Sequence, residues 1–484
     1  MFVGRDAELT FLQERYEAPG GQLVVLYGRR RVGKTETLRM FCRDKAHVFY
    51  ACREVADAEQ LRAFSERVLK AGVPAARYVR AFANWETALG SVADLPAAGG
   101  KKLLILDEFP YMCRGNAAIP SLLQNLWDET LKAQDVMLIL CGSAMSFIEK
   151  KLLSEKNPLY GRATGIYKMT AMPFYDAVKF FPAYSDTDKV LAYAALGGIP
   201  HYLRQFDPGL PLGDNIRRHI LTKGSVLYSE IEFFTRQELR ETALYNTLLE
   251  AVALGNTQLG DIHGKTQIDK AKISVYLKNL MELEIVTREF SVLSGTKEKA
   301  ASSRGLYRLT DHFFRFWFHF VFPNLSELET GDADGIYRYV VQPQLDAFAS
   351  LAFEDICRAY LRHKNRTNEL PFRFTKLGRW WGKAQRTVSG RRETYETEID
   401  VMAVDRDADN YLIGECKFRN AALDLPEYRS LTGKFRPPKP NAACHTYLFS
   451  KSGFTEDLLA LAARDGSVSC LTLRDIVGGA DADA

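Results

Sequence analysis

Short apolar runs that end in polar residues recur in the first third of the chain. "QLVVLY" at 22–27 stops at Gly28, and an amphipathic stretch follows the glycine-rich segment. "KKLLILDEFP" at 101–110 and "DVMLILCGS" at 135–143 have the same form, and residues 119–132 have helical periodicity. Buried strands that alternate with helices predict an α/β fold, in which helices cover both faces of a parallel sheet. Ligands then belong at the carboxyl ends of the strands.

The pattern changes beyond residue 170. Residues 171–237 are mostly helical, with a glycine-proline break in "ALGGIPHYL". Residues 238–325 contain two helical stretches and then two strand patterns around a polar tip, which predicts a winged helix-turn-helix. Such modules place their second helix in the DNA major groove, but many only bridge domains, so both roles stay open.

The remaining segments are assigned from composition and periodicity. "DHFFRFWFHFVFPN" is the most aromatic segment, and we assign it to packing rather than to base stacking. The acidic, glycine-containing stretch 326–336 is predicted to be a linker. Residues 337–478 begin with a helix and continue with strands, a helix and more strands, and the tail "GGADADA" is expected to be disordered.

Bulk composition excludes several classes of protein. With 484 residues, of which 46% are hydrophobic and 26% charged, the chain is expected to fold into about three globular domains. No apolar run approaches the ~20 residues of a membrane helix, and the charged start "MFVGRDAELTFLQERY" does not resemble a secretory signal. Eight cysteines are scattered without a C-x-x-C pair. We therefore expect a cytoplasmic protein with reduced thiols and no membrane partner.

Charge is unevenly distributed although the net charge is only +4. Between Arg358 and Arg392 there are eleven Lys and Arg residues against one acid, Glu369, and among them lie Phe372, Phe374, Trp380 and Trp381. Cations that meet phosphates and rings that stack on bases suit a nucleic-acid surface. A solvated basic face is the equal alternative.

"GRRRVGKT" is a G-x-x-x-x-G-K-[ST] motif between a strand and a helix. Gly28 and Gly33 let the backbone curl so that its N–H groups face phosphate oxygens. Lys34 adds positive charge against the β- and γ-phosphates, and Thr35 supplies a hydroxyl to Mg²⁺. We assign Thr37 to the same nucleotide site. The motif predicts ATP as cofactor, together with Mg²⁺.

Acidic residues are expected to act together with the glycine-rich loop. Asp107 and Glu108 close the apolar "LLIL", where one carboxylate serves the metal and the other orients the attacking water. Ser143 after "LILCG" either senses the γ-phosphate or caps a helix. Arg162 in "NPLYGRATG" either stabilises charge during phosphoryl transfer, from its own or a neighbouring subunit, or forms a surface salt bridge. Action between subunits would require an oligomer.

These stretches, together with "FVGRDAELTFL" and "ALGGIPHYL", occur in the order seen in the archaeal-type AAA ATPase family, which is related to the signal-transduction (STAND) ATPases. The chain resembles that family over nearly its whole length. The resemblance implies ATP binding, slow regulated hydrolysis, "FVGRD" near the adenine, and an attached winged helix and nuclease-like domain. The implied order is a P-loop ATPase core at 1–170, a helical lid at 171–237, a winged helix-turn-helix at 238–325 and the nuclease-like domain at 337–478.

A second motif lies in "ETEIDVMAVDRDADNYLIGECKF", two alternating strands around the turn "RDADN". Asp400 and Glu415 would lie at one end of this hairpin, and Lys417 shares a strand face with Glu415. The two carboxylates can hold a divalent metal, Lys417 can position or deprotonate a water, and Glu354 adds a carboxylate from the preceding helix.

This arrangement resembles the PD-(D/E)XK nuclease superfamily, a restriction-endonuclease-like α/β fold. All four of its active-site positions are filled, with Ile399 in place of the usual proline before Asp400. The resemblance implies Mg²⁺ or Mn²⁺ at Glu354, Asp400 and Glu415, and DNA as substrate. A decayed fold that retains an E-x-K strand is the alternative.

The preferred interpretation is an ATPase whose nucleotide state controls a DNA-binding, metal-dependent nuclease-like domain. Two alternatives remain: a non-cleaving ATP switch that docks a protein partner on its C-terminal domain, and a transcription regulator that acts through the winged helix.

Overall fold

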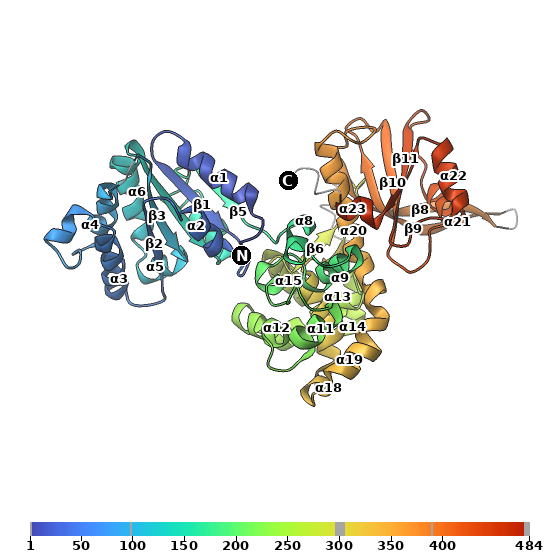
Figure 1. Ribbon diagram of the computed structural model, residues 1–484, viewed down its shortest axis with the longest axis horizontal. Helices are drawn as coiled ribbons and strands as arrows, with labels where there is room; N and C mark the ends of the chain where they lie inside the picture. Colours follow the sequence, from blue (N-terminus) through green and yellow to red (C-terminus); the bar gives the residue numbers. More distant parts are fainter. Residues whose placement is uncertain (1, 97–98, 296–304, 389–390, 479–484) are drawn as a thin grey trace. The chain divides into compact units, whose positions relative to one another are not determined.

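The computed structural model describes residues 2–96, 99–295, 305–388 and 391–478. The chain divides into two compact units (Figure 1). Unit 1 comprises residues 1–172 and the short segment 199–201, and unit 2 comprises residues 173–198 and 202–484. The tip of the predicted wing and the tail beyond Gly478 lie outside the described residues.

Unit 1 is built on a parallel sheet with the strand order β2-β3-β4-β1-β5. Its strands are β1 (Gln22–Tyr27), β2 (His47–Ala51), β3 (Lys102–Asp107), β4 (Val136–Gly142) and β5 (Gly165–Lys168). Every residue of β1 and β4 is buried, because both faces of a parallel sheet are covered by helices. The predicted α/β fold with a parallel sheet is therefore confirmed.

The helices of unit 1 pack an aromatic core against this sheet. They are α1 (Asp6–Glu17), α2 (Lys34–Phe41), α3 (Asp57–Lys70), α4 (Trp85–Gly90), α5 (Phe109–Gly115), α6 (Ile119–Glu129) and the single turn α7 (Met145–Phe147). The ring of Phe64 lies 5.3 Å from that of Tyr50 and 5.5 Å from that of Trp85. This core holds the strand ends that carry the nucleotide motifs.

Unit 2 begins with helices that pack against later ones. These early helices are α8 (Phe174–Ala177), α9 (Asp186–Leu196), α10 (Pro200–Leu203, shared with the 199–201 segment of unit 1), α11 (Leu212–Ile216) and α12 (Val226–Glu238). α9 contacts α17 (His312–Phe316) and α20 (Gln342–Arg366). Trp317 is fully buried and donates its indole N–H to the carbonyl of Tyr228 at 2.9 Å. The aromatic segment packs the core, as predicted.

Three helices and a two-stranded antiparallel sheet occupy the middle of unit 2. They are α13 (Thr242–Ala253), α14 (Leu259–Thr266), α15 (Lys270–Glu282), β6 (Val286–Glu289) and β7 (Leu306–Leu309). Asp269 caps α15 by accepting the backbone N–H groups of Ala271 and Lys272. The sequence pattern predicts only the first and third of these helices, and α14 was not predicted.

The predicted linker at 326–336 is helical, so that prediction was wrong. This stretch contains α18 (Leu325–Glu329) and α19 (Ala333–Ile336). The acids that suggested a linker hold it against the unit, because Glu329 accepts a hydrogen bond from Tyr228 at 2.6 Å and Asp334 pairs with Arg217 at 2.6 Å. Asp332 caps α19.

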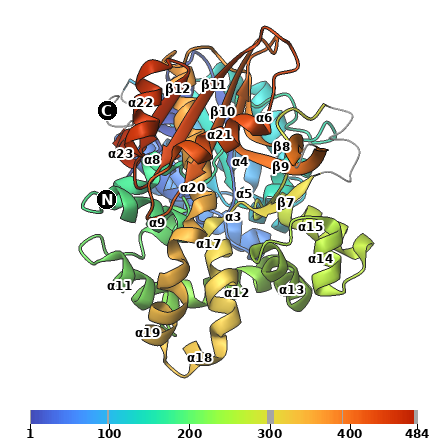
Figure 2. The ribbon, with the colours of Figure 1, turned by 90° about the vertical axis from the view of Figure 1, so that its right-hand side faces the viewer.

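The C-terminal part of unit 2 is a mixed sheet with the order β12-β11-β10-β9-β8 (Figure 2). Its elements are β8 (Lys376–Val388), β9 (Arg391–Val404), β10 (Asn410–Lys417), α21 (Leu425–Lys434), β11 (Ala443–Ser450), α22 (Glu456–Arg464), β12 (Val468–Thr472) and α23 (Leu473–Val477). Leu448 packs in the core with Leu431 of α21 and Leu458 of α22, whereas Phe449 meets Tyr360 of α20. Alternation along β11 thus puts α20 on one face and α21 and α22 on the other.

β9 and β10 form the predicted hairpin, with antiparallel pairing and the turn between Val404 and Asn410. Among the helices of the described ranges, none is both long and apolar enough to cross a membrane.

Candidate functional site

The glycine-rich loop joins β1 to α2 at the carboxyl end of the sheet of unit 1. A Cβ atom on Gly28 would lie 2.1 Å from the carbonyl oxygen of Met169, so only glycine fits there. Gly33 has φ +93°, a left-handed conformation that favours glycine, and its Cβ position would be 3.7 Å from the ring of Pro200. The loop therefore needs glycine at both predicted positions.

Lys34 begins α2 and is buried beside the loop. Its ammonium donates hydrogen bonds to the carbonyls of Gly28 and Arg29, at 2.9 Å each. Burial lowers the pKa of Lys34, although Glu108 and Asp107 oppose the shift. A cation held over the loop in this way suits an anionic ligand.

Thr35 and Asp107 meet across two elements. The Thr35 hydroxyl donates to Asp107 Oδ2 at 2.7 Å, and Asp107 is the last residue of β3. A hydroxyl and a carboxylate placed together are the oxygen ligands that Mg²⁺ uses beside phosphates. Thr37 is fully buried and donates to the carbonyl of Gly33 at 3.0 Å, so it braces the loop from inside.

Glu108 has a strained backbone and a restrained carboxylate. Its φ of +52° is unusual for a residue other than glycine, and such strain often marks functional positions. Ser143, which follows β4, donates to Glu108 Oε2 from its hydroxyl at 2.9 Å and from its backbone N–H at 3.2 Å. Ser143 therefore contacts an acid that is expected to act with the glycine-rich loop.

Arg162 forms an ion pair near the surface. Its guanidinium binds both oxygens of Asp128 at 2.7–3.0 Å and also donates to the carbonyl of Pro158. This is the salt-bridge alternative of the sequence analysis, in the conformation described.

Arg5 of "FVGRD" braces the same loop. Its guanidinium is buried and donates to the carbonyl of Val32 at 2.5 Å and to that of Thr170 at 2.9 Å, while Glu8 pairs with it at 2.6 Å. The family resemblance implies a place near the adenine for this motif, and the contact of Arg5 with the P-loop backbone was not predicted.

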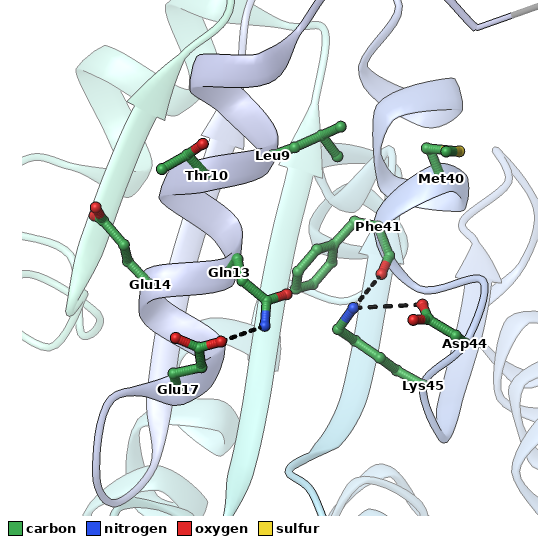
Figure 3. Close-up of a pocket in the computed structure, with 9 residues that line it drawn as sticks. All are labelled: Leu9, Thr10, Gln13, Glu14, Glu17, Met40, Phe41, Asp44 and Lys45. Atoms are coloured by element: carbon green, nitrogen blue, oxygen red, sulfur yellow. Dashed lines mark hydrogen bonds and ion pairs between the residues drawn. The ribbon is translucent and has the colours of Figure 1, made fainter.

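A surface pocket of about 460 Å³ lies between α1 and α2 (Figure 3). Its lining includes Gln13 and Glu17 of α1, Phe41 at the end of α2, and Lys45 in the segment that follows α2. The glycine-rich loop adjoins the opposite end of α2, and the described lining contains none of the predicted nucleotide-binding residues. This pocket is therefore separate from the P-loop.

The second candidate site joins α20, β9 and β10 in unit 2. Asp400 Oδ2 accepts the backbone N–H of Cys416 at 2.9 Å, which ties the two strands together beside Glu415. The Cys416 thiol contacts Cys357 on α20, so alternation turns Glu415 and Lys417 to the other side of β10, toward α21. Lys417 binds Glu415 Oε1 at 2.6 Å.

A lysine with no signal in the sequence motif also binds Glu415. Lys434, the last residue of α21, binds Glu415 Oε2 at 3.0 Å. The two lysines outweigh burial and lower the pKa of Glu415. No spacing rule connects a helix end to an E-x-K strand, so only the folded structure reveals Lys434.

Glu354 lies beside this cluster on α20. Burial and the neighbouring Asp400 raise the pKa of Glu354 to about 7, although Arg379 and Arg358 oppose the shift at 3.5 Å and 3.4 Å. Burial and Glu415 also raise the pKa of Asp400. Asp400 therefore interacts electrostatically with Glu354 on the α20 side of the sheet and with Glu415 on the α21 side.

The carboxylate oxygens of this site suit a hard divalent cation, but the carboxylates are not brought together around one position. Within residues 2–96, 99–295, 305–388 and 391–478, no group of three or more His, Cys, Asp or Glu side chains is placed to hold a metal ion. Both oxygens of Glu415 are bound by ammonium groups. The carboxylates would have to exchange these partners to bind a metal.

Part of the basic run belongs to the interior rather than to a nucleic-acid surface. Arg358 is buried and pairs with Asp355 at 2.7 Å, and Arg379 pairs with Glu398 at 2.9 Å. Lys364 pairs with Glu369, the acid of the run, at 2.5 Å. Others of the run, such as Arg373 and Lys383, are exposed. The solvated basic surface is thus smaller than the sequence count indicates.

Comparison with known proteins gives two family matches. Residues 2–206 match an ATPase domain predominantly from Archaea, and residues 317–429 match a family of archaeal and bacterial proteins of unknown function. An uncharacterized protein of Methanocaldococcus jannaschii, MJECL04, is 31% identical over 464 residues, which cover 92% of this chain and 98% of that protein.

Solved structures give weaker matches. The Walker-type ATPase PABY2304 of Pyrococcus abyssi has a TM-score of 0.49 at 20% identity and covers 66% of this chain and 96% of its own. The ORC2 protein of Aeropyrum pernix, as ADPNP and ADP complexes, has a TM-score of 0.38 at 13% identity, with 69% of this chain and 92% of its own covered.

Proposed function

Since the chain belongs to the same family as the Methanocaldococcus jannaschii protein and carries an archaeal-type ATPase domain, we propose that ATP hydrolysis in unit 1 regulates a nuclease-like site in unit 2. DNA is the proposed substrate, and Mg²⁺ or Mn²⁺ the proposed metal. The nuclease-like part of this proposal rests on one observation, the grouping of Glu354, Asp400, Glu415 and Lys417.

At the P-loop, the backbone N–H groups around Gly28 and Gly33 and the ammonium of Lys34 bind the triphosphate. Thr35 and Asp107 would hold Mg²⁺, which would supply positive charge to neutralise the phosphate oxygens. Glu108 orients the attacking water after its carboxylate leaves Ser143. Arg162 would stabilise the transferring phosphoryl group only after leaving Asp128, within one subunit or between two.

In unit 2, Asp400 and Glu415 are the proposed metal ligands, with Glu354 beside them. A metal held by these carboxylates would supply Lewis-acid polarisation of the phosphodiester. Lys417 positions the attacking water, and the raised pKa of Glu354 lets that carboxyl hold a proton near neutral pH. The element α13–α15 with β6 and β7 is proposed as a winged helix that contacts DNA through α15.

One observation favours the non-cleaving switch. Glu415 is neutralised by two ammonium groups, and in the described part of the chain no three-residue metal cluster exists. In that alternative, ATP binding controls a protein partner of unit 2, and the acidic cluster stabilises the fold.

A cleavage assay distinguishes the regulated nuclease from the non-cleaving switch. The purified full-length protein is incubated with plasmid and single-stranded DNA, with and without ATP, Mg²⁺ and Mn²⁺. We expect metal-dependent cleavage that Asp400→Asn abolishes while ATP hydrolysis persists. Asp409→Asn is the matched control, because Asp409 lies in the turn of the same hairpin and pairs with Lys439. Intact ATP hydrolysis without cleavage by the parent protein in any of these mixtures would identify a switch.

A further inference from the structure

Lys434 contacts the carboxylate at the centre of the proposed site. Its ammonium lies 3.0 Å from Glu415 Oε2, while Lys417 occupies Oε1 at 2.6 Å. The side chain of Lys434 is 18% exposed and that of Glu415 is 10% exposed. Lys434 is therefore largely enclosed with its partner and is unlike a solvated surface lysine.

The end of α21 is fixed by packing on both sides of Lys434. Leu431 is fully buried in the core between α21 and the sheet. The ring of Phe435 lies 5.4 Å from that of Trp380 and 5.2 Å from that of Tyr411. Because its backbone is held in this way, Lys434 can change partners only by rotation of its flexible four-carbon side chain.

Lys417 and Lys434 share the charge of Glu415 and also act on Asp400, whose Oδ2 accepts the backbone N–H of Cys416. A divalent cation that took over Glu415 would release the Lys434 ammonium from its carboxylate. A cation that becomes available next to proposed metal ligands is suited to an anionic oxygen, and a phosphodiester supplies one.

We propose that Lys434 is a phosphate-binding residue of this site, which holds Glu415 before a divalent cation binds and contacts a phosphate oxygen of the nucleic-acid backbone afterwards. This inference rests on the proposed nuclease-like function. It adds to that function a direct competition between Lys434 and the metal for the same carboxylate oxygen, and a second role for Lys434 in substrate binding.

The competition is tested by Mn²⁺ titration calorimetry on the full-length protein without nucleotide or DNA. Lys434→Met and Lys434→Gln remove the competing ammonium, so each should bind Mn²⁺ about threefold to tenfold more tightly than the parent, the range expected from loss of one partly exposed ion pair. Glu415→Gln identifies the heat that belongs to this site. Lys439→Met is the matched control, since Lys439 pairs with Asp409 at 2.7 Å and is 52% exposed.

The substrate role is tested by fluorescence anisotropy with a short DNA duplex in Ca²⁺, with salt varied. Loss of one phosphate contact should weaken binding by Lys434→Met and reduce the slope of log affinity against log salt by about 0.9. Lys439→Met should behave like the parent in this assay too.

The outcomes distinguish failure of the Lys434 inference from failure of the proposed metal site. Mn²⁺ binding that depends on Glu415 but is equally strong in the parent and in both Lys434 variants overturns the competition and leaves the metal site standing. Unchanged DNA affinity and salt slope in those variants overturn the phosphate contact. If Glu415→Gln removes no Mn²⁺ heat from any of these proteins, the metal site fails and this inference fails with it.

Discussion

Glu354 and Asp355 are consecutive residues of α20 whose replacement should change stability in opposite directions. Burial and Asp400 raise the pKa of Glu354 to about 7. Burial also acts to raise the pKa of Asp355, but Arg308 at 2.9 Å and Arg358 at 2.7 Å outweigh it and lower that pKa. The first carboxylate is thus destabilised in the folded state and the second is stabilised.

The sign and size of the Glu354 effect follow from proton linkage. The folded state binds the Glu354 proton more tightly than the unfolded state does, so stability falls as the pH rises from about 4.5 to about 7. The difference between these pKa values corresponds to about 3 kcal/mol at pH 8. The raised pKa already includes the attraction of Arg379 and Arg358, so Glu354→Gln removes a net cost, and we expect a gain of about 2–3 kcal/mol at pH 8.

Asp355→Asn should have the reverse effect. It leaves the guanidinium groups of Arg308 and Arg358 without their buried carboxylate, which costs about 3–5 kcal/mol. Since the folded pKa of Asp355 is lowered, its stabilisation is complete above the ordinary pKa near 4 and is lost only at lower pH. The loss should therefore be equal at pH 5 and pH 8.

Differential scanning calorimetry of the full-length protein at both pH values measures these changes. ATP identifies the transition of unit 1 because a ligand stabilises the unit that binds it, and the other transition belongs to unit 2. We expect Glu354→Gln to raise the Tm of unit 2 by a few degrees at pH 8 and not at pH 5. A lower Tm than the parent at pH 8, or an equal gain at pH 5, would refute the reasoning.

Three further predictions concern ATP. Lys34→Ala should abolish ATP binding in calorimetry, and retained nucleotide heat would contradict the assignment of the P-loop. Ser143→Ala removes the hydroxyl contact with Glu108, so basal ATP turnover should rise by up to about fivefold; a fall would instead support γ-phosphate sensing by Ser143. Arg162→Ala should lower turnover by at least about tenfold while Asp128→Ala preserves it, and equal turnover in both variants would show that the pair is only structural.

The sequence predicted the central strands of unit 1 because they are continuously apolar and flanked by motif residues. β2 and β5 were not predicted, since β2 buries only two of its five residues and β5 is a four-residue edge strand on which Ile166 is half exposed. α14 was missed because its eight residues include two glycines. The stretch 326–336 was misassigned because its acids pair with partners distant in the sequence, such as Tyr228 and Arg217.

In the candidate sites too, residues that belong to local sequence motifs were predicted, and a residue that joins the site through a long-range contact was not. Glycine-rich loops and E-x-K strands have local spacing rules, so Lys34, Asp107, Asp400 and Glu415 were all selected from sequence. Lys434 reaches Glu415 only because α21 packs on the sheet, and no local pattern records that contact.

Residues 199–201 make the ATPase unit discontinuous along the chain. A gene fragment that stops after Met172 would encode all five strands and the P-loop but would lack Pro200, whose ring lies next to Gly33. Limited proteolysis or recombination at that boundary would likewise leave the nucleotide loop without one of its neighbours. Dissection of this protein into separately expressed halves therefore needs a fragment that extends at least to His201.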